Sequence, residues 1–192
     1  MKRTEIIQKF INQINAKKYL EIGMGCGVNH NSIYCDYKLS VDPTPTVPVT
    51  HSMTSDDFFS QNGETFDVIF IDGLHWSEQV YKDIINSLKI LNEGGFIVCH
   101  DMNPPDEGHQ IYPQPQTQAN WTGDCWKAWV KLKTERSDLN MCVVDTDYGC
   151  GIITRGKQEL IKVKKELNYD LLHNDRINLL NLITIDEFKI KF

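Results

Sequence analysis

The stretch Tyr19-Leu20-Glu21-Ile22-Gly23-Met24-Gly25-Cys26-Gly27 is a short apolar run that continues into a glycine at every second position. It predicts a strand followed by a tight turn into a helix, because glycine lets backbone N–H groups approach a ligand that a Cβ would exclude. A second apolar run ends at Val41-Asp42, about 20 residues after Glu21, where a carboxylate at a neighbouring strand end can accept both hydroxyls of a ribose. The spacing therefore predicts a nucleoside site.

Strand-like and helical patterns alternate along the chain and predict its architecture. Helical patterns lie near 30, at 77–91 and at 123–136, and another precedes the glycine run with an apolar face of Ile6, Ile7, Phe10, Ile11 and Ile14. Strand-like runs lie at 18–22, 39–42, 66–71, 95–100, 141–145 and 149–154. This order predicts a mostly parallel sheet with helices on both faces and an antiparallel hairpin across 145–149. The leucine-rich segment 169–182 predicts a helix packed on the sheet or against a partner subunit.

Composition excludes several classes of function. With 192 residues, of which 41% are hydrophobic, the chain is long enough for a single domain with its own core. No apolar run approaches the roughly 20 residues of a membrane span, and the formal net charge of −6 disfavours a nucleic-acid partner. The six cysteines form no Cys-x-x-Cys pair, which favours reduced thiols and, with the polar N-terminus, a cytoplasmic location. We therefore expect a small-molecule partner, and a homo-oligomer is compatible with the sequence.

All seven prolines lie in two segments that follow strand ends, at 43–48 and at 104–115. The second segment belongs to a stretch from 102 to 122 that is longer than most connections in compact domains, and long loops often serve as lids. Its Tyr112 and Trp121 offer flat apolar surface to an acceptor. We predict a substrate-side lid at 102–122, with a passive surface loop as the alternative.

The glycine run resembles the Glu/Asp-x-Gly-x-Gly-x-Gly motif of class I S-adenosylmethionine-dependent methyltransferases. It differs from the dinucleotide motif Gly-x-Gly-x-x-Gly, because Val28 stands where the third glycine would be. The runs Phe66–His75 and Gly94–Asp101 look like the fourth and fifth strands of the same family. The resemblance implies a Rossmann-like, doubly wound α/β fold with a seven-stranded sheet. The resemblance covers roughly residues 19–156 and implies S-adenosylmethionine as the cofactor. Together with the length of the chain, it predicts one methyltransferase domain over 1–192, with a C-terminal helical extension at 157–192.

The resemblance also assigns roles at the cofactor site. Gly23, Gly25 and Gly27 would let the backbone approach the cofactor, and Glu21 would anchor the turn or the cofactor's ammonium group. Asp42 would hold the ribose. The remaining candidates for cofactor contacts are Ser52 and Thr54, in the loop that carries adenine contacts in the family, and Asp72. Capping of a helix at 56–60 is an equally good interpretation of that loop.

Four titratable residues follow two neighbouring strands and predict the chemistry of the site. Asp72 and Asp101 each end an apolar run, and His75 and His100 lie beside them. Two confined carboxylates repel each other unless a cation neutralises them. The arrangement resembles metal-dependent O-methyltransferases of the catechol and antibiotic-sugar types, which implies a divalent metal at Asp72, His100 and Asp101. A histidine ligand suits Mn²⁺, Fe²⁺ or Zn²⁺ better than Mg²⁺.

His75 is the first candidate for the general base that takes the acceptor's proton, and His100 is the second. The alternative is that one of the two histidines only shapes its turn. The leading hypothesis is an O-methyltransferase that acts on a small hydroxylated acceptor of the sugar or natural-product type. An N-methyltransferase without a metal and a non-catalytic cofactor-binding protein are the alternatives, and a nicotinamide-dependent oxidoreductase fits the glycine spacing less well.

Overall fold

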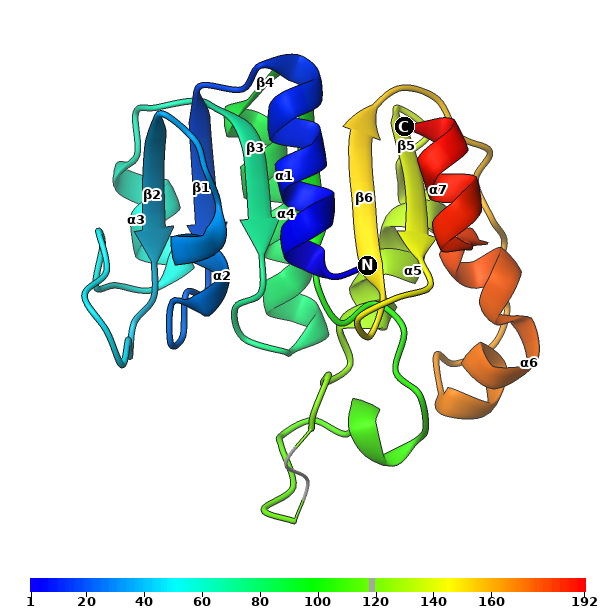
Figure 1. The fold of residues 1–192 in the computed structure, drawn as a ribbon. Helices are drawn as coiled ribbons and strands as arrows, with labels where there is room; N and C mark the ends of the chain where they lie inside the picture. Colours follow the sequence, from blue (N-terminus) through cyan, green and yellow to red (C-terminus); the bar gives the residue numbers. More distant parts are fainter. Residues whose placement is uncertain (118–119) are drawn as a thin grey trace.

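The computed structural model describes residues 1–117 and 120–192, and seven strands of this part form one sheet (Figure 1). Its order is β2-β1-β3-β4-β6-β5-β7. The strands are β1 (Lys18–Ile22), β2 (Tyr37–Val41), β3 (Phe66–Ile71), β4 (Leu91–Cys99), β5 (Leu139–Val144), β6 (Cys150–Arg155) and β7 (Leu182–Ile183). Strands β2, β1, β3 and β4 pair in parallel, β6 is antiparallel to both β4 and β5, and β7 is parallel to β5. The predicted fold class is confirmed.

Helices cover both faces of the sheet, which explains the almost continuous apolar runs of its central strands. One face packs against α1 (Arg3–Ile14) and α7 (Ile185–Lys191), and α1 lies in front of the sheet in Figure 1. The other face packs against α3 (Ser55–Gln61), α4 (Ser77–Ile90), α5 (Cys125–Glu135) and α6 (Tyr169–Leu180). None of the helices in the described ranges has both the length and the apolar composition needed to cross a bilayer.

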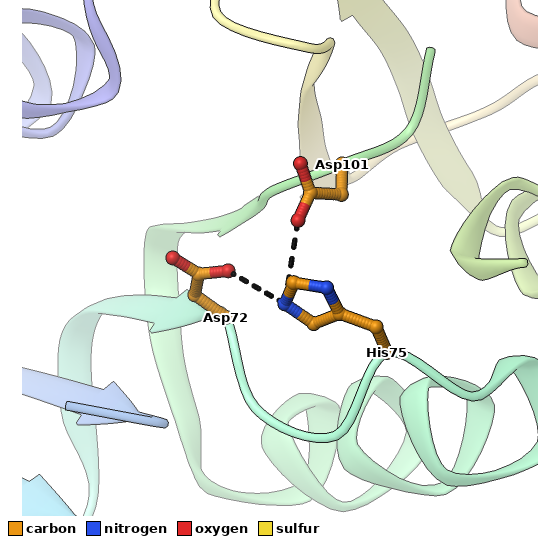
Figure 2. Close-up of side chains that lie close together, drawn as sticks. All are labelled: Asp72, His75 and Asp101. Atoms are coloured by element: carbon orange, nitrogen blue, oxygen red, sulfur yellow. Dashed lines mark hydrogen bonds and ion pairs between the residues drawn. The ribbon is translucent and has the colours of Figure 1, made fainter. Parts of the chain in front are cut away.

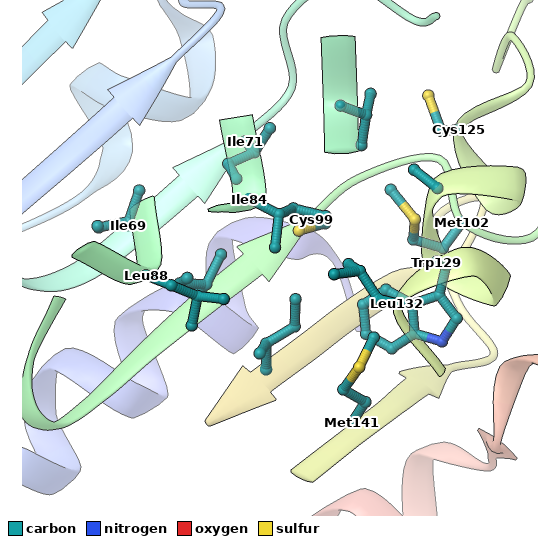
Figure 3. Close-up of a cluster of buried hydrophobic side chains, with 14 of the residues drawn as sticks. Ile69, Ile71, Ile84, Leu88, Cys99, Met102, Cys125, Trp129, Leu132 and Met141 are labelled. Carbon is teal, nitrogen blue, oxygen red and sulfur yellow. The ribbon is translucent and has the colours of Figure 1, made fainter. Parts of the chain in front are cut away.

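Alternate residues of the central strands enter the two cores. In β3, Ile69 and Ile71 pack with α4 and α5, whereas Val68 and Phe70 pack with α1. Figure 3 shows the first of these cores, where Ile69 and Ile71 face Ile84 of α4 and the buried ring of Trp129 lies on α5. The period of two along each strand therefore divides one apolar run between two separate cores.

Several elements differ from the sequence-based expectations in their bounds or in their place in the strand order. The helix expected at 77–91 ends at Ile90, and β4 begins at once at Leu91, because Leu91 pairs with Phe66 before the register shifts. The helix expected at 169–182 ends at Leu180, and β7 pairs with the edge of β5. The runs that resemble the family's fourth and fifth strands form β3 and β4, since residues 42–54 contribute a bridge between Val41 and His51 and no strand.

The order of the strands places a crevice at the carboxyl end of β1. The chain leaves β1 toward β2 on one side and later returns to β3 on the other side, so the loops after β1 and β3 diverge. Figure 1 shows the long connection after β4 projecting from this same end of the sheet. The crevice between the diverging loops is therefore the expected place for a ligand.

Asp83 is a buried carboxyl group on α4, with an exposed fraction of 1%. The Gln79 side chain donates a hydrogen bond from Nε2 to Asp83 Oδ1 at 3.0 Å. Burial raises the pKa of Asp83 to about 6, even though Ser55 and Gln79 bind its ionised form. In the unfolded chain an aspartate has a pKa of about 4.

We predict that Asp83→Asn stabilises the protein at pH 8 and not at pH 4. The folded state holds the Asp83 proton more tightly than the unfolded state, so the contribution of Asp83 is present below about pH 4 and is lost as the pH rises through about 6. Asparagine does not ionise, and it should raise the free energy of unfolding at pH 8 by up to about 3 kcal/mol. Urea unfolding at both pH values measures this, and an equal effect at both contradicts it.

Candidate active site

A cavity of about 780 Å³ opens at the carboxyl ends of β1 to β4. This volume lies within the range of roughly 300 to 1,000 Å³ that is typical of small-molecule sites. Its wall includes the turn after β1, Asp42 after β2, the first residues of α3, the turn after β3 and Asp101 after β4. Trp121 and Tyr148 complete the wall on the side of the long connection.

Gly23 and Gly25 both have a left-handed backbone, but they differ in the space around the missing Cβ. Gly23 has φ +84°, and a Cβ there would lie 2.1 Å from the backbone oxygen of Asp72, so the turn after β1 packs directly on the turn after β3. Gly25 has φ +55°, but a Cβ there would meet no described atom within 4 Å. Gly27, at φ +74°, precedes the short helix α2 (Val28–Ser32). Of the three, Gly25 leaves the backbone open to the cavity.

Glu21 stabilises the turn after β1 through buried hydrogen bonds. Its carboxylate is 1% exposed and accepts hydrogen bonds from Tyr19 Oη at 2.6 Å and from Asn29 Nδ2 at 3.0 Å. Asn29 belongs to α2, and its amide oxygen accepts in turn from Thr4 of α1. This geometry favours the role of a turn anchor over direct contact with a ligand, although Glu21 also contributes to the cavity wall.

Asp42 is held rigidly at the edge of the cavity. Its Oδ2 accepts from the backbone N–H of Gly25 at 2.7 Å, and its Oδ1 accepts from that of Thr44 at 2.8 Å. Each oxygen retains a second lone pair for a ligand hydroxyl. Thr54 also lines the cavity, and its hydroxyl caps α3 by accepting from the N–H of Asp57. Ser52 is exposed and lies outside the cavity lining, so the structure does not bring it together with the others.

Asp72, His75 and Asp101 converge at the inner end of the cavity, as Figure 2 shows. His75 Nε2 lies 3.3 Å from Asp72 Oδ1 and 3.3 Å from Asp101 Oδ2. The other ring nitrogen, Nδ1, lies 3.2 Å from the backbone oxygen of Trp121. Only a protonated Nδ1 can donate to that carbonyl, so a neutral His75 turns its Nε2 lone pair toward two carboxylates. That arrangement requires a cation, which is either a proton on Nε2 or a metal ion.

The pKa shifts of Asp72, His75 and Asp101 reflect the same need for positive charge beside the two carboxylates. Burial opposes charge on Asp72, but the imidazoles of His100 and His75 hold the pKa of Asp72 well below its ordinary value. Burial likewise opposes charge on His75, but the hydrogen bond to Asp72 and the charge of Asp101 raise the pKa of His75. Burial raises the pKa of Asp101. Asp101 also has φ +64°, a strained backbone for a residue other than glycine, which often marks functional sites.

His100 supports the cluster from the side of α1. Its Nδ1 lies 3.1 Å from Asp101 Oδ1 and 3.4 Å from Asp72 Oδ1. Burial alone would lower the pKa of His100. The carboxylates around the ring have the larger effect and raise this pKa well above its ordinary value. However, the Arg3 guanidinium lies 2.6 Å from His100 Nε2, and two N–H donors cannot share so short a contact. The geometry therefore favours a neutral His100 that accepts from Arg3 and donates to the carboxylates.

Arg3 is a site residue that the sequence analysis did not identify. It begins α1, donates its backbone N–H to Asp147 Oδ2 at 2.9 Å, and places its guanidinium 4.0 Å from Asp72 Oδ2. Tyr148, in the same turn as Asp147, also lines the cavity. No motif marks these residues, because they reach the site only when α1 and the turn between β5 and β6 fold over the end of the sheet. Gln79 was missed too, although its place on the helical pattern at 77–91 was visible.

The connection after β4 is attached to the cluster by aromatic rings. Trp121 stacks on His75 with ring centroids 4.9 Å apart, Tyr112 stacks on Trp121 at 6.1 Å, and Trp76 stacks on Tyr112 at 5.7 Å. A short 3-10 helix, η1 (Gly108–Gln110), lies in the same connection. Residues 118–119 of the predicted lid lie outside the described part of the chain. The described part of the loop closes one side of the cavity.

Comparison with known proteins agrees with this geometry. Residues 38–102, from β2 to the residue after Asp101, match a family model described as a methyltransferase domain. No sequence among the curated proteins matched the chain. Residues 38–102 are therefore similar to a methyltransferase domain, and the fold of the chain is that of class I S-adenosylmethionine-dependent methyltransferases, as the glycine run suggested.

Three solved structures illustrate the likeness, and at their low identities they show the fold. Cofactor-bound Rv0187 from MTB is 15% identical with a TM-score of 0.61, and the match covers 81% of this chain and 80% of that chain. The O-methyltransferase TomG from Streptomyces achromogenes, in complex with SAM, is 12% identical with a TM-score of 0.59, covering 81% and 80%. The mycinamycin-pathway methyltransferase MycE, in complex with Mg, SAH and mycinamycin VI, is 13% identical with a TM-score of 0.50, covering 84% and 50%.

We predict that Gly23→Ala and Gly25→Ala differ sharply in stability. Both place a Cβ on a left-handed backbone, which costs about 1–2 kcal/mol. At Gly23 the Cβ would also overlap the Asp72 backbone, and we expect an additional loss of several kcal/mol or failure to fold. At Gly25 the space is open, so the loss should stay near the strain alone. Chemical unfolding of both variants measures the difference, and equal losses would show that the packing of the two turns is unimportant.

Proposed function

We propose that the protein transfers the methyl group of S-adenosylmethionine to a hydroxyl group of a small acceptor, assisted by a divalent cation at Asp72, His75 and Asp101. The observation that carries this proposal is the lone pair of His75 Nε2, which the Trp121 carbonyl turns toward two carboxylates beside a nucleoside-sized cavity. The O-methyltransferase TomG and the Mg-complexed MycE, which share the fold, support the type of acceptor atom and the cation.

The cavity fits the cofactor in three respects. The backbone at Gly25 is open, the carboxylate of Asp42 is already oriented by two N–H groups, and the acid cluster lies at the opposite side of the crevice. Among the described lining residues, Arg3 is the only lysine or arginine, and it already contacts Asp147. A dinucleotide's pyrophosphate would therefore find little positive charge here. A singly charged sulfonium cofactor suits this acidic wall better.

The donor set also fits a divalent cation. One ligand atom from each of Asp72, His75 and Asp101 lies within 4.8 Å of the other two, so a single ion can contact all three. A histidine that binds a metal through one nitrogen usually donates its other N–H to a carbonyl or carboxylate, as His75 does to Trp121. Two carboxylates with one imidazole favour Mn²⁺, Fe²⁺ or Zn²⁺ over Mg²⁺. A bound cation would lower the pKa of an acceptor hydroxyl that contacts it.

This arrangement changes the roles expected for the two histidines. His75 becomes the ligand, and His100 becomes the residue that orients Asp72 and Asp101 while Arg3 binds its other nitrogen. Without a cation, the Nε2 of His75 is available for the acceptor's proton, and His75 is then the general base of the sequence-based hypothesis. In both cases Trp121 stacks on the imidazole and helps to exclude water from it. We retain residues 102–122 as the acceptor-side lid.

We predict that the protein binds S-adenosylmethionine and S-adenosylhomocysteine and does not bind NAD. Asp42→Ala should weaken the binding of S-adenosylhomocysteine by about 1 to 3 kcal/mol, because the ribose hydroxyls lose a charged acceptor. Ser52→Ala, at an exposed position outside the cavity, should leave the affinity unchanged. Titration calorimetry measures all of these, and tight NAD binding without a response to the sulfonium cofactor would refute the assignment.

We predict that the protein, once stripped with a chelator, binds Mn²⁺ and releases close to one proton, because the metal replaces the proton on His75. Asp101→Asn and His75→Gln should each lower the affinity for Mn²⁺ at least about tenfold. Asp145→Asn is the control, since Asp145 contacts Asn103 outside the cluster. Calorimetry in two buffers gives both affinity and proton release. Full methyl transfer in the absence of any bound cation favours the metal-free alternatives, including transfer to an amine.

A further inference from the structure

A polar network lies at the outer end of the cavity, away from the acid cluster. The side-chain nitrogen of Gln79 lies 3.0 Å from Asp83 Oδ1, 3.0 Å from Asp56 Oδ1 and 3.2 Å from Ser55 Oγ, so its two N–H groups are shared among three acceptors. Ser55, Asp56 and Gln79 line the cavity, whereas Asp83 is buried behind them. The network joins the first turn of α3 to α4.

The two carboxylates determine which way the amide of Gln79 points. An amide carries its donors on nitrogen and its acceptor on oxygen, and the two ends look alike in shape. A carbonyl oxygen at 3.0 Å from both Asp56 and Asp83 would be repelled by each, so the group facing them must be the NH₂. The amide oxygen of Gln79 is therefore left without a donor among the described residues and remains available to a ligand.

The other side chain of the network has the same polarity. The hydroxyl of Ser55 also binds the Asp83 carboxylate, so its proton points away from the cavity as well. Buried Asp83 thus attracts the donors of both Gln79 and Ser55, and this end of the cavity presents acceptors. The complementary group on a ligand is a hydrogen-bond donor such as an amino group.

The order of the strands indicates which part of the cofactor reaches this network. Helix α3 follows β2, whereas Asp101 follows β4, and β1 and β3 lie between these strands. At a spacing of about 4.8 Å per strand, the two ends of the crevice are roughly 14 Å apart. With the reactive methyl beside Asp101 and the ribose at Asp42, the nucleobase extends toward the start of α3 and Gln79.

We propose that Asp83 is a positioning residue that holds the Gln79 amide with its oxygen toward the exocyclic amino group of the cofactor's base, so that the site selects a 6-aminopurine over a 6-oxopurine. The proposal rests on the proposed function, because it places S-adenosylmethionine in this cavity. A 6-oxopurine would bring its carbonyl oxygen against the amide oxygen of Gln79, and two acceptors in contact cost binding energy.

The test compares S-adenosylhomocysteine with its 6-oxo analogue, S-inosylhomocysteine, by calorimetry on the intact protein. We expect the wild type to prefer the amino form at least about tenfold. Gln79→Leu should reduce the preference to about threefold or less, because it weakens the binding of S-adenosylhomocysteine. Asp83→Asn should reduce it at least about threefold, because only the exposed Asp56 then opposes the reversed orientation of the Gln79 amide. Ser87→Ala is the matched control on α4, where the hydroxyl is fully buried outside the cavity.

The ratio of the two affinities separates positioning from a purely structural link between α3 and α4. A structural link would weaken both ligands alike, so an unchanged ratio in Asp83→Asn and Gln79→Leu overturns the proposal. Equal binding of the two ligands by the wild type overturns it as well and leaves the cofactor assignment intact. Failure of the wild type to bind S-adenosylhomocysteine at all overturns the proposed function and this inference together.

Discussion

The contact between Gly23 and the backbone of Asp72 is the constraint on which the site depends. It joins the turn after β1 to the turn after β3 so closely that no side chain fits between them. The glycine turn and the loop that carries the acid cluster are therefore packed directly against each other. Methyl transfer requires an acceptor atom and a methyl carbon to be aligned within a fraction of an ångström, and rigid strand ends supply such alignment better than independent loops.

Charge balance is the second determinant of the site. Asp72, Asp101 and Asp147 bring three carboxylates to one end of the sheet, and Arg3, His75 and His100 lie among them. Each carboxylate has a positively charged or hydrogen-bonding neighbour, which is the condition for burying it. Between His75 Nε2 and the two aspartates, the described partners leave a lone pair that faces negative charge. The proposed cation would compensate the negative charge at this position.

The fold persists at identities of 12–15% to the solved structures compared here because few of its requirements are specific to one residue. Buried strands need apolar side chains of suitable size, and helices need one apolar face, which many sequences provide. The turn after β1 is more demanding, since its backbone geometry excludes side chains at Gly23. The outer wall of the cavity differs in kind, because the long connection and the turn at 145–149 are loops, and loop sequences vary more freely than the elements that they connect.

Much of the molecule could be predicted from local pattern. The alternation of apolar runs and helical faces determined the α/β class, the antiparallel hairpin and most element positions, because these follow from short-range periodicity. The carboxylates of Asp72 and Asp101 were predictable as neighbours, since parallel strands end at the same edge. The spacing of Gly23, Gly25 and Gly27 indicated the tight turn after β1, and that of Asp42 indicated a carboxylate at the neighbouring strand end, whereas their contacts with a cofactor stay predictions.

Only the tertiary structure decided which side chains face one another within that edge. Arg3 reaches His100 across 97 positions of sequence and Asp147 across 144, and no local pattern records such contacts. The division of roles between His75 and His100 depends on the Trp121 carbonyl and the Arg3 guanidinium, which orient individual ring nitrogens. Likewise, β7 forms because an edge of β5 is open to it. Periodicity determines which elements form, whereas the direction of a side chain depends on partners that only the folded chain assembles.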